Sequence, residues 1–468
     1  MFCIEIKETD FRYFMNELKT RRILGFPDEF WIGFVIMIGI FLKLVYNVSA
    51  GYEGCTSNLG SWSAVVNDIP NSGHLGVLQY YYFYHHLPNF DPTLIAGYTN
   101  PPLYYIVGAL ILELFNGVMK WNLGSVLHCI QCINFIYVLV GMFAGIGMFS
   151  KMGIKGRKYV MLLLFLMFFP GLYNLGAGID NAPMAFMFAM LAMNKAFKWY
   201  EQRNKRNLIG SAIMLGLCMM TKLFYGIVAI PIASLFIMAR FYDRRCPNKD
   251  LYINMGVYAV IVLVLGWWYP IRNLIKFGTS PFYIIPETDS WQYVTTYSIG
   301  QRLGLPSLNE LFQLHQTTNT YYEYNILAQT FKTTVVDEKA LNLSTIGPLF
   351  IARLLVIFLI LFTILAIVML IRALAGYRMT LEKKIFVGTG LASSIIFYII
   401  RCLKSGTVSA MNFREIPFVI FFLCMGVGLC GRATSQDTPF EKTTTAIAHF
   451  FIVVIALMSA FLFGFYAI

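Results

Sequence analysis

The chain has 468 residues, of which 58% are hydrophobic and 13% are charged, with a mean hydropathy of +0.64 and a formal net charge of +12. A soluble globular domain carries about 25% charged residues, so this chain is too poor in charge to cover its own surface, and its solvent is predicted to be lipid. The Lys and Arg residues cluster between apolar stretches without a basic stripe or nucleic-acid-binding motif, which predicts no nucleic-acid partner.

Runs of about 20 apolar residues recur along the chain, which is the length that crosses a hydrocarbon core of about 30 Å. Backbone amides in lipid must be paired within the chain, so the spans are predicted to be helices. We expect an all-α polytopic membrane protein with about 11 spans, or 12 if the segment 102–118 also crosses. We expect one transmembrane domain, residues 30–468, after an N-terminal segment, residues 1–29.

Charge predicts the orientation of the spans in a plasma membrane. Residues 1–29 are too basic and too long for a signal n-region and are read as cytoplasmic, followed by a first span at 30–48. Later basic loops fall at 151–158, 195–206, 240–249, 372–384 and 432–442. Two long stretches, about 49–101 and 272–346, are then external. One crossing must separate the external stretch that ends at 101 from the internal loop that begins at 151, but two apolar segments lie between them. Either the segment 102–118 dips into the membrane and returns, which we favour, or the loop 151–158 breaks the charge rule.

The first external stretch is the most polar part of the chain and contains Glu53, Asp68 and His74. Its segment QYYYFYHH suits an interfacial amphipathic helix, and adjacent histidines make a weak metal pair because their side chains diverge on a helix. Pro101-Pro102 predicts the start of a helix, since a proline in the first turn loses no hydrogen bond.

Asp180 lies in the stretch LYNLGAGIDNAPMAF, at an outward-facing turn between two spans. An acid at membrane depth is costly and is usually functional or paired. The alternative is helix capping, because Asp180 or Asn181 followed by Pro183 suits the start of a helix. The pieces 208–221 and 223–238 suggest a hairpin of two spans with Lys222 at its tip.

Four basic residues lie at helix ends on the outer side, against the charge rule: Lys222, Arg272, Lys276 and Arg414. An Arg fork and a Lys point charge suit a lipid-linked phosphate or pyrophosphate. The alternative is snorkelling beside Tyr and Trp, which we favour for Lys276.

Taken in order, several stretches resemble bacterial polyprenyl-phosphate-sugar-dependent glycosyltransferases of the dolichyl-phosphate-mannose protein mannosyltransferase-like group, which have the GT-C membrane fold. The resemblance covers nearly all of residues 30–468, and each motif in it is loose. The stretches are Gly73-His74, Pro101-Pro102-Leu103, Ile179-Asp180-Asn181, Met220-Thr221-Lys222, WWYPIRNLIKFGTSPFY, NILAQTFKTTVVDE and MNFREIPF.

The resemblance implies a sugar donor linked to polyprenyl phosphate, an acceptor that is a lipid, glycan or protein, and inversion by direct displacement at the outer face. It also implies an acidic residue in the first external loop as general base or donor contact, often with a divalent metal such as Mg²⁺ or Mn²⁺. On this basis Asp68 or Glu53 is the candidate base and Asp180 the second acid. The candidate substrate contacts are His74, Asn58, Asn100, Lys222, Arg272 and Arg414, with His74 as a loop or metal contact.

The chain departs from the family pattern at three polar positions. Asn58 stands at the nearest match to the loop acid, Asn100 replaces a His before the Pro-Pro pair, and Ala182 follows Asp180-Asn181 where the family has Asn-Asn-Asp. An Asn side chain cannot serve as a base. An inactive protein of the same fold, which binds lipid-linked sugar or serves as an assembly subunit, is therefore the first alternative. A transporter is the second, although no inverted repeat is visible.

Overall fold

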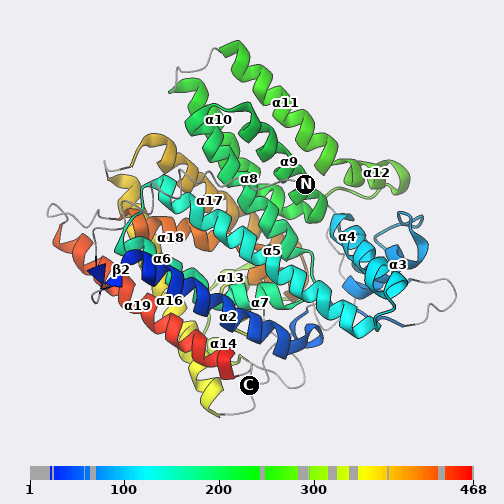
Figure 1. Ribbon diagram of the computed structural model, residues 1–468, viewed down its shortest axis with the longest axis horizontal. Helices are drawn as coiled ribbons and strands as arrows, with labels where there is room; N and C mark the ends of the chain where they lie inside the picture. Colours follow the sequence, from blue (N-terminus) through cyan, green and yellow to red (C-terminus); the bar gives the residue numbers. More distant parts are fainter. Residues whose placement is uncertain are drawn as a thin grey trace.

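The computed structural model describes residues 22–23, 26–56, 58–63, 70–242, 248–282, 294, 296–314, 324–336, 346–376, 379–430 and 438–465. These residues are almost entirely helical, which confirms the all-α prediction (Figure 1). The exception is a two-residue antiparallel pairing of β1 (Arg22–Ile23) with β2 (Phe26–Pro27). Residues 1–21, which carry most of the expected cytoplasmic segment, lie outside the described part of the chain.

The helices follow one another along the described part of the chain. The first half holds α2 (Asp28–Cys55), α3 (Gly73–Tyr84), α4 (Leu103–Leu112), the π-helical η1 (Glu113–Val118), α5 (Leu123–Met152), α6 (Arg157–Phe168), α7 (Pro170–Ala177), α8 (Ala182–Gln202) and α9 (Lys205–Thr221). The second half holds η2 (Leu223–Val228), α10 (Ala229–Phe241), α11 (Asn248–Gly266), α12 (Trp268–Phe277), α13 (Ile299–Leu303), α14 (Leu308–Phe312), α15 (Ile326–Val335), α16 (Ile346–Ala375), α17 (Leu381–Lys404), η3 (Val408–Met411), η4 (Phe413–Glu415), α18 (Val419–Leu429) and α19 (Pro439–Phe465).

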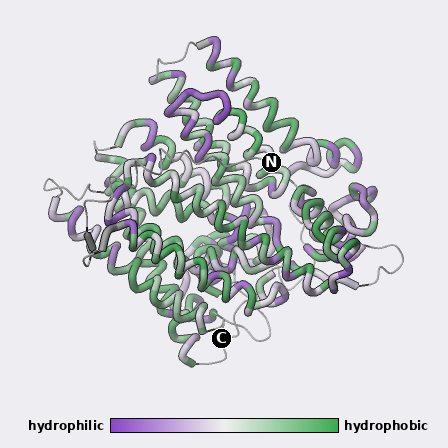
Figure 2. The backbone as a smooth tube through the Cα atoms, in the orientation of Figure 1, coloured by the Kyte–Doolittle hydropathy of each residue, from purple (hydrophilic) through white to green (hydrophobic). Residues whose placement is uncertain are grey.

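Among the described residues, seven helices are long and apolar enough to cross a membrane, or eight when the bent pair α6 and α7 counts as one span. This number is smaller than the 11 or 12 spans expected from the apolar runs. The difference arises because some apolar runs form short or broken helices: α18 has 11 residues, and α6 and α7 bend by 44° where Pro170 follows the extended residue Phe169. A residue before proline is biased away from helical backbone, so the break is encoded locally. Figure 2 shows hydrophobic residues along most of the length of α2, α16 and α19.

Contacts join three of the basic loops, 151–158, 372–384 and the one after α18, at one end of the bundle, called the basic end. Lys383 Nζ donates to the carbonyl of Lys151 at 2.9 Å, and Lys158 Nζ donates to the carbonyl of Cys430 at 2.6 Å. These contacts join three loops that are far apart in the sequence. They agree with the charge ladder, in which these loops share one side of the membrane.

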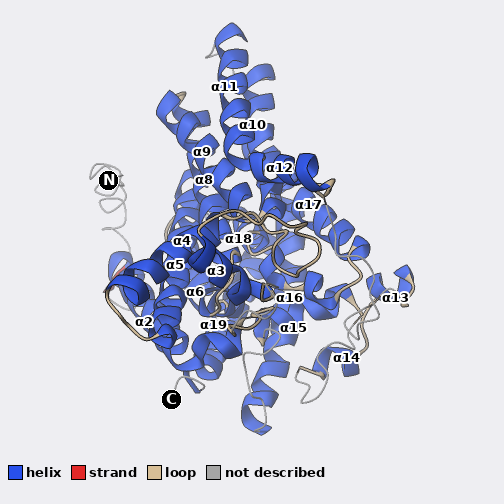
Figure 3. Ribbon diagram, turned by 90° about the vertical axis from the view of Figure 1, so that its right-hand side faces the viewer, coloured by secondary structure: helices blue, strands red, loops and turns tan. Residues whose placement is uncertain are grey.

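At the opposite end, the stretch expected as a long external loop at 272–346 is partly packed into the bundle. Thr333 and Thr334 of α15 are buried, and the carbonyl of Thr334 accepts from Asn174 Nδ2 of α7 at 3.2 Å. Thr333 Oγ1 accepts from the backbone N–H of Phe413 at the start of η4, at 2.9 Å. Figure 3 shows α15 beside α16, with α13 and α14 farther out.

The segment 102–118 returns to the end where it began. Pro102 is the N-cap of α4, and its carbonyl accepts from Ile106 at 2.9 Å, which confirms the helix start predicted from the Pro-Pro pair. α4 packs on α3, and η1 leads back through four residues to α5. The first turn of α5, at Leu123, lines the same hollow as Glu53 at the end of α2. This geometry supports the expectation that the segment dips in and returns.

Helix packing gives a first testable prediction. A Cβ added at Gly145 of α5 would collide with the ring of Phe421 of α18, whereas Gly33 of α2 has nothing within 4 Å of such a Cβ. Gly145→Leu is expected to lower the free energy of unfolding by about 1–3 kcal/mol, the usual effect of overpacking. Gly33→Leu is the matched control and should not destabilise. Thermal midpoints of both variants in one detergent check this, and equal midpoints would contradict the packing of α5 on α18.

Candidate functional site

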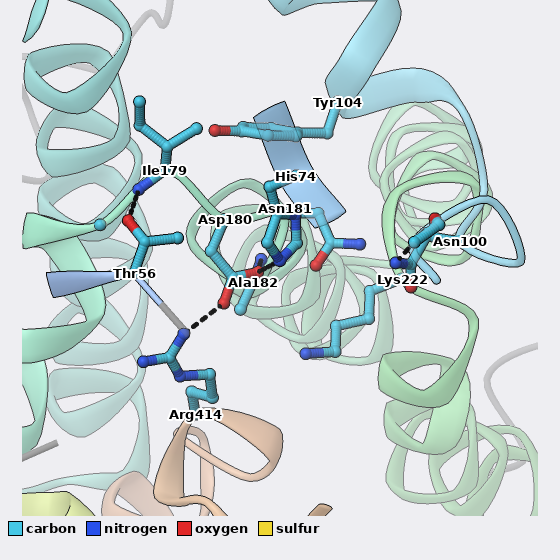
Figure 4. Close-up of polar contacts among 12 residues, drawn as sticks. Thr56, His74, Asn100, Tyr104, Ile179, Asp180, Asn181, Ala182, Lys222 and Arg414 are labelled. Atoms are coloured by element: carbon cyan, nitrogen blue, oxygen red, sulfur yellow. Dashed lines mark hydrogen bonds and ion pairs between the residues drawn. The ribbon is translucent and has the colours of Figure 1, made fainter. Parts of the chain in front are cut away.

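Asp180 lies at the end opposite the basic loops, in the turn between α7 and α8. Its side chain is buried, and Oδ2 lies 2.9 Å from Nη1 of Arg414 in η4 (Figure 4). Oδ1 accepts from the backbone N–H of Ala182 at 2.9 Å. Both interpretations from the sequence therefore hold, because the carboxylate caps α8 and also pairs with a cation.

Thr56, directly after α2, and two side chains of α5 bind the backbone of this turn. Thr56 Oγ1 accepts from the N–H of Ile179 at 2.8 Å, and Asn134 Nδ2 donates to the carbonyl of Gly178 at 2.8 Å. Gln131 Nε2 donates to the carbonyl of Ala177 at 2.6 Å. A turn inside an apolar bundle has backbone groups that no helix satisfies, and these side chains satisfy them. The position of Asp180 is therefore supported by Thr56 and by α5.

His74 approaches Asp180 from the start of α3. Gly73 has φ +76°, and a Cβ there would lie 2.6 Å from the carbonyl oxygen of Asn58. The glycine lets residues 58–60 lie against the start of α3, where the carbonyl of Asn58 accepts from the N–H of His74 at 3.0 Å. The Gly-His pair noted in the sequence thus has a structural reason: the glycine allows the close approach that orients the histidine.

The His74 ring joins Asp180 to α4. Its Nε2 lies 3.8 Å from Asp180 Oδ1, and its Nδ1 lies 2.9 Å from the Tyr105 hydroxyl. That hydroxyl accepts from Asn100 Nδ2 at 3.3 Å, so its own proton is available to Nδ1. In the tautomer in which Nδ1 accepts that proton, Nε2 carries the ring proton on the side of Asp180. Asn100 therefore acts on the site through Tyr105.

Glu415 forms the second half of the network. Its Oε1 lies 2.8 Å from Nζ of Lys222, at the break between α9 and η2, and its Oε2 lies 3.1 Å from Nη2 of Arg401 in α17. Arg414 and Glu415 are consecutive, so η4 presents a cation to Asp180 and an anion to two other cations. Lys222 is confirmed at the tip of a helical hairpin, and the partner that it meets there is a carboxylate.

The carboxylates of the network are ionised at neutral pH. Burial raises the pKa of Asp180, and it is lowered by more by the charge that His74 gains at acid pH and by the cations of Lys222 and Arg414. Burial also raises the pKa of Glu415, and the cations of Arg401 and Lys222 outweigh that effect and lower it.

The pKa of His74 is lowered, first by burial, with Asp180 opposing and Lys222 and Arg414 assisting. His74 is therefore neutral at pH 7, and Arg414 is the charged partner of Asp180.

Among the described residues, the network contains two carboxylates, Asp180 and Glu415, and three cations, Lys222, Arg401 and Arg414. An anion that arrived beside these cations would be attracted to them, and most strongly where they are buried. The arrangement is therefore suited to binding an anionic group, with Arg forks and a Lys ammonium as its donors.

The other candidate residues lie apart from this network. Glu53 is exposed and lines a hollow of about 450 Å³, together with Tyr52, Leu59, Gly60, Trp62, Leu75, Leu123, Gly124 and Leu127. Asn58 is exposed, with φ +52°. Arg272 donates to the carbonyl of Pro88 at 2.6 Å and to Asn273 Oδ1 at 2.8 Å, so the structure does not bring it to Lys222 and Arg414. Asp68 lies outside the described residues.

The expectation of an interfacial helix at QYYYFYHH is revised. Tyr80 and Tyr81 of QYYYFYHH are buried, and Tyr80 packs edge-on against Phe90 and Tyr98, so this part of α3 belongs to a core. The exposed residues of this segment lie at its end, at Phe83, Tyr84, His85 and His86.

Within the described residues, no group of three His, Cys, Asp or Glu side chains is placed to hold a metal ion. Asp180 directs its oxygens to Arg414 and Ala182, which does not fit a metal ligand.

Sequence reasoning missed Arg401, Glu415 and Tyr105. Glu415 adjoins Arg414 in a stretch with helix-breaking residues on both sides, Asn412 and Pro417, and this was the available signal. Arg401 lies near the end of an apolar helix, where snorkelling is the ordinary explanation. Only the fold brings Lys222, Arg401 and Glu415 together.

The buried pair predicts a coupled loss of stability. Asp180→Asn removes the carboxylate from beside the Arg414 guanidinium and should lower the free energy of unfolding by about 3–5 kcal/mol, as expected when one partner of a buried pair is removed. Asp180→Asn combined with Arg414→Gln should cost less than the sum of the single changes. Thermal midpoints of the four proteins give the cycle, with the exposed Lys276→Gln as control. Additive losses would show that the two side chains do not interact.

Burial of neutral His74 predicts a pH dependence. The folded protein binds a proton at His74 less readily than the unfolded chain, whose histidines titrate near pH 6.5. The stability from His74 is thus fully present above that pH and is lost as the pH falls below it. Thermal midpoints between pH 8 and pH 5 should fall less steeply for His74→Gln than for the natural protein. The exposed His85→Gln should keep the natural slope, and an unchanged slope in His74→Gln would refute the assignment.

No protein-family model and no curated protein sequence matches the chain. Among solved structures, the chain aligns with a crystal structure of ArnT from Cupriavidus metallidurans in the apo state. The TM-score is 0.39 and the identity 11%, over 86% of this chain and 78% of that chain. A similarity of this size carries no argument, so the proposals below rest on the residues of this chain.

Proposed function

We propose that the protein is a membrane glycosyltransferase that takes a sugar from a polyprenyl-phosphate donor and passes it to a lipid, glycan or protein acceptor. The donor phosphate binds at the charged network of Asp180, Lys222, Arg401, Arg414 and Glu415. One observation carries the proposal: the scattered stretches that resemble the family meet at one end of the bundle, around these charges.

Hydrogen bonds and an ion pair join these stretches directly. Asn181 Nδ2 donates to the carbonyl of Thr221 at 3.1 Å, which joins the Ile-Asp-Asn turn to the Met-Thr-Lys tip. The Asp180–Arg414 pair joins the same turn to MNFREIPF. The Tyr269 hydroxyl of WWYPIRN donates to the carbonyl of Tyr98, just before the Pro-Pro pair, at 3.0 Å. Residues separated by up to 234 positions thus form one site.

The chemistry follows from charge. An acceptor hydroxyl attacks the anomeric carbon as the bond from that carbon to the phosphate oxygen breaks, and negative charge grows on the departing polyprenyl phosphate. Cations already in place stabilise that charge without reorganising. In this proposal Arg414 and Lys222 meet the phosphate, and Asp180 positions Arg414.

A general base must accept the proton of the acceptor hydroxyl. Asp180 is poorly suited, since its carboxylate is already held by Arg414 and its pKa is lowered. Glu53 is exposed in a hollow of about 450 Å³, which an acceptor can reach. Glu53 is therefore the proposed base among the described residues, and Asp68 keeps the candidacy that its position in the loop suggests.

A second candidate function is non-catalytic binding of the lipid-linked sugar. Asn58 favours it, because it stands at the family's acid position with a side chain that cannot accept a proton. Asn100 favours it too, since its amide donates to the carbonyl of Gly97 at 3.1 Å and supports the loop. A transporter requires paired broken helices in matching halves, and the described residues contain one bent pair.

A transfer assay tests the proposal. Purified protein in nanodiscs receives radiolabelled polyprenyl-phosphate hexose or pentose donors, with and without a divalent metal. Arg414→Gln should reduce transfer by about 100-fold or more, as loss of a charge-stabilising donor does. Glu53→Gln should reduce it by a factor of about 10²–10⁴. Arg414→Lys should recover only part of the activity, because Lys lacks the fork.

Arg240→Gln is the matched control for Arg414, because Arg240 lies in the last turn of α10 and donates to the Tyr252 hydroxyl of α11, apart from the charged network. It should transfer sugar normally. Donor binding without turnover in the natural protein would favour the non-catalytic alternative. Full activity in Arg414→Gln would remove the network from the proposed site.

A further inference from the structure

Glu415 occupies a place that a phosphate would fit. Its two oxygens face two cations from different helices, Lys222 Nζ at 2.8 Å and Arg401 Nη2 at 3.1 Å. A phosphate group presents oxygens in a similar way and prefers the same donors. The carboxylate of the chain itself thus fills a two-cation anion site.

Glu415 is held more firmly by Lys222 than by Arg401. Lys222 is buried and makes a hydrogen bond to Oε1, whereas Oε2 is buried and has no hydrogen bond among the described residues, although Arg401 is close. The Arg401 contact is therefore one of charge with loose geometry. It is the side on which another anion competes most easily.

The same side is open to a ligand. The side chain of Arg401 is 31% exposed, compared with 7% for Glu415 and 10% for Lys222. The Arg401 guanidinium lies over the ring of Phe224, with 4.6 Å from Cζ to the ring centroid. Arg401 therefore contacts the surroundings and the network at once, beside an aromatic ring that suits an apolar chain.

Glu415 lies on a segment with few internal hydrogen bonds. η4 is a three-residue 3₁₀-helix, and the next residue, Ile416, has φ −135° and ψ +42°, outside helical geometry. A short 3₁₀ turn is held by fewer and poorer hydrogen bonds than an α-helix. A small rotation at this point moves Glu415 without unfolding a long helix.

We propose that Lys222 and Arg401 form a binding site for the phosphate group of a polyprenyl phosphate, and that Glu415 occupies this site until the phosphate displaces it. This inference rests on the proposed function for the identity of the lipid. It assigns Arg401 as the first cation that the phosphate meets and makes Glu415 an internal competitor. Affinity for the phosphate is then limited by the strength of the Glu415 contacts.

The test measures binding without any sugar. Farnesyl phosphate, a short polyprenyl phosphate, and inorganic phosphate are titrated by calorimetry into the full-length protein in detergent. Glu415→Ala removes the competitor and leaves room, so it should bind farnesyl phosphate at least about tenfold more tightly than the natural protein, or about 1.4 kcal/mol. Glu415→Gln, which removes the charge and keeps the volume, should gain less. Adding Arg401→Gln to Glu415→Ala should abolish the gain.

The control is Glu382→Ala, which removes a carboxylate from the other end of α17 and should not change binding. Equal or weaker binding by Glu415→Ala would overturn the proposal, since Glu415 would then be a structural partner of the cations. An equal gain for inorganic phosphate would overturn the assignment to a lipid phosphate. If Glu415→Ala does not fold, Arg401→Gln alone decides: a tenfold loss of farnesyl phosphate binding supports the site, and unchanged binding refutes it.

These outcomes separate this proposal from the proposed function. The expected binding pattern in a protein that transfers no sugar would refute the glycosyltransferase and leave the phosphate site. Sugar transfer by a protein that lacks this binding pattern would support the glycosyltransferase and refute the phosphate site at Lys222 and Arg401.

Discussion

The ion pair between Asp180 and Arg414 is the contact on which the opposite end of the bundle depends. Each side chain is at most 10% exposed, and an isolated charge in such a place would cost more free energy than a domain has to spare. The pair therefore constrains where the turn before α8 and the short helix η4 can lie. Since Glu415 follows Arg414 directly, the same constraint extends to Lys222 and Arg401. The dipeptide Arg414-Glu415 thus links the turn before α8, the break between α9 and η2, and the end of α17.

These interruptions explain why polar side chains gather there. A helix that ends inside an apolar bundle leaves N–H and C=O groups that must find partners. Thr56 and Asn134 satisfy the turn at Asp180, and Asn412 accepts from the N–H of Arg414 at 2.9 Å. The Tyr225 hydroxyl donates to the carbonyl of Arg414. The side chains that pair the free backbone groups and the side chains that pair with one another as charges therefore lie in the same region of the bundle. The site is thus held on one side by Thr56 and α5 and on the other side by η4.

The amount that could be predicted differs from residue to residue. Asp180, Lys222 and Arg414 stood out in the sequence because a charge at an outward-facing helix end is costly, and the structure brings all three into one network. Arg272 had the same signature and binds a loop carbonyl elsewhere. The sequence shows that a charge needs a partner and does not show which one, because partners 193 and 234 residues apart are chosen by packing. Glu415 was overlooked for that reason, although it adjoins Arg414.

The sequence by itself determined the helical class, the lipid environment, the gathering of basic loops at one end and the helix start after Pro102. These properties depend on composition and on neighbours a few residues away, which act before any long-range contact forms. Tertiary structure decided that the segment 102–118 returns, that α15 is buried, and that Glu415 lies between Lys222 and Arg401. Those outcomes depend on side-chain volumes and charges meeting across helices, and no local pattern in the chain encodes them.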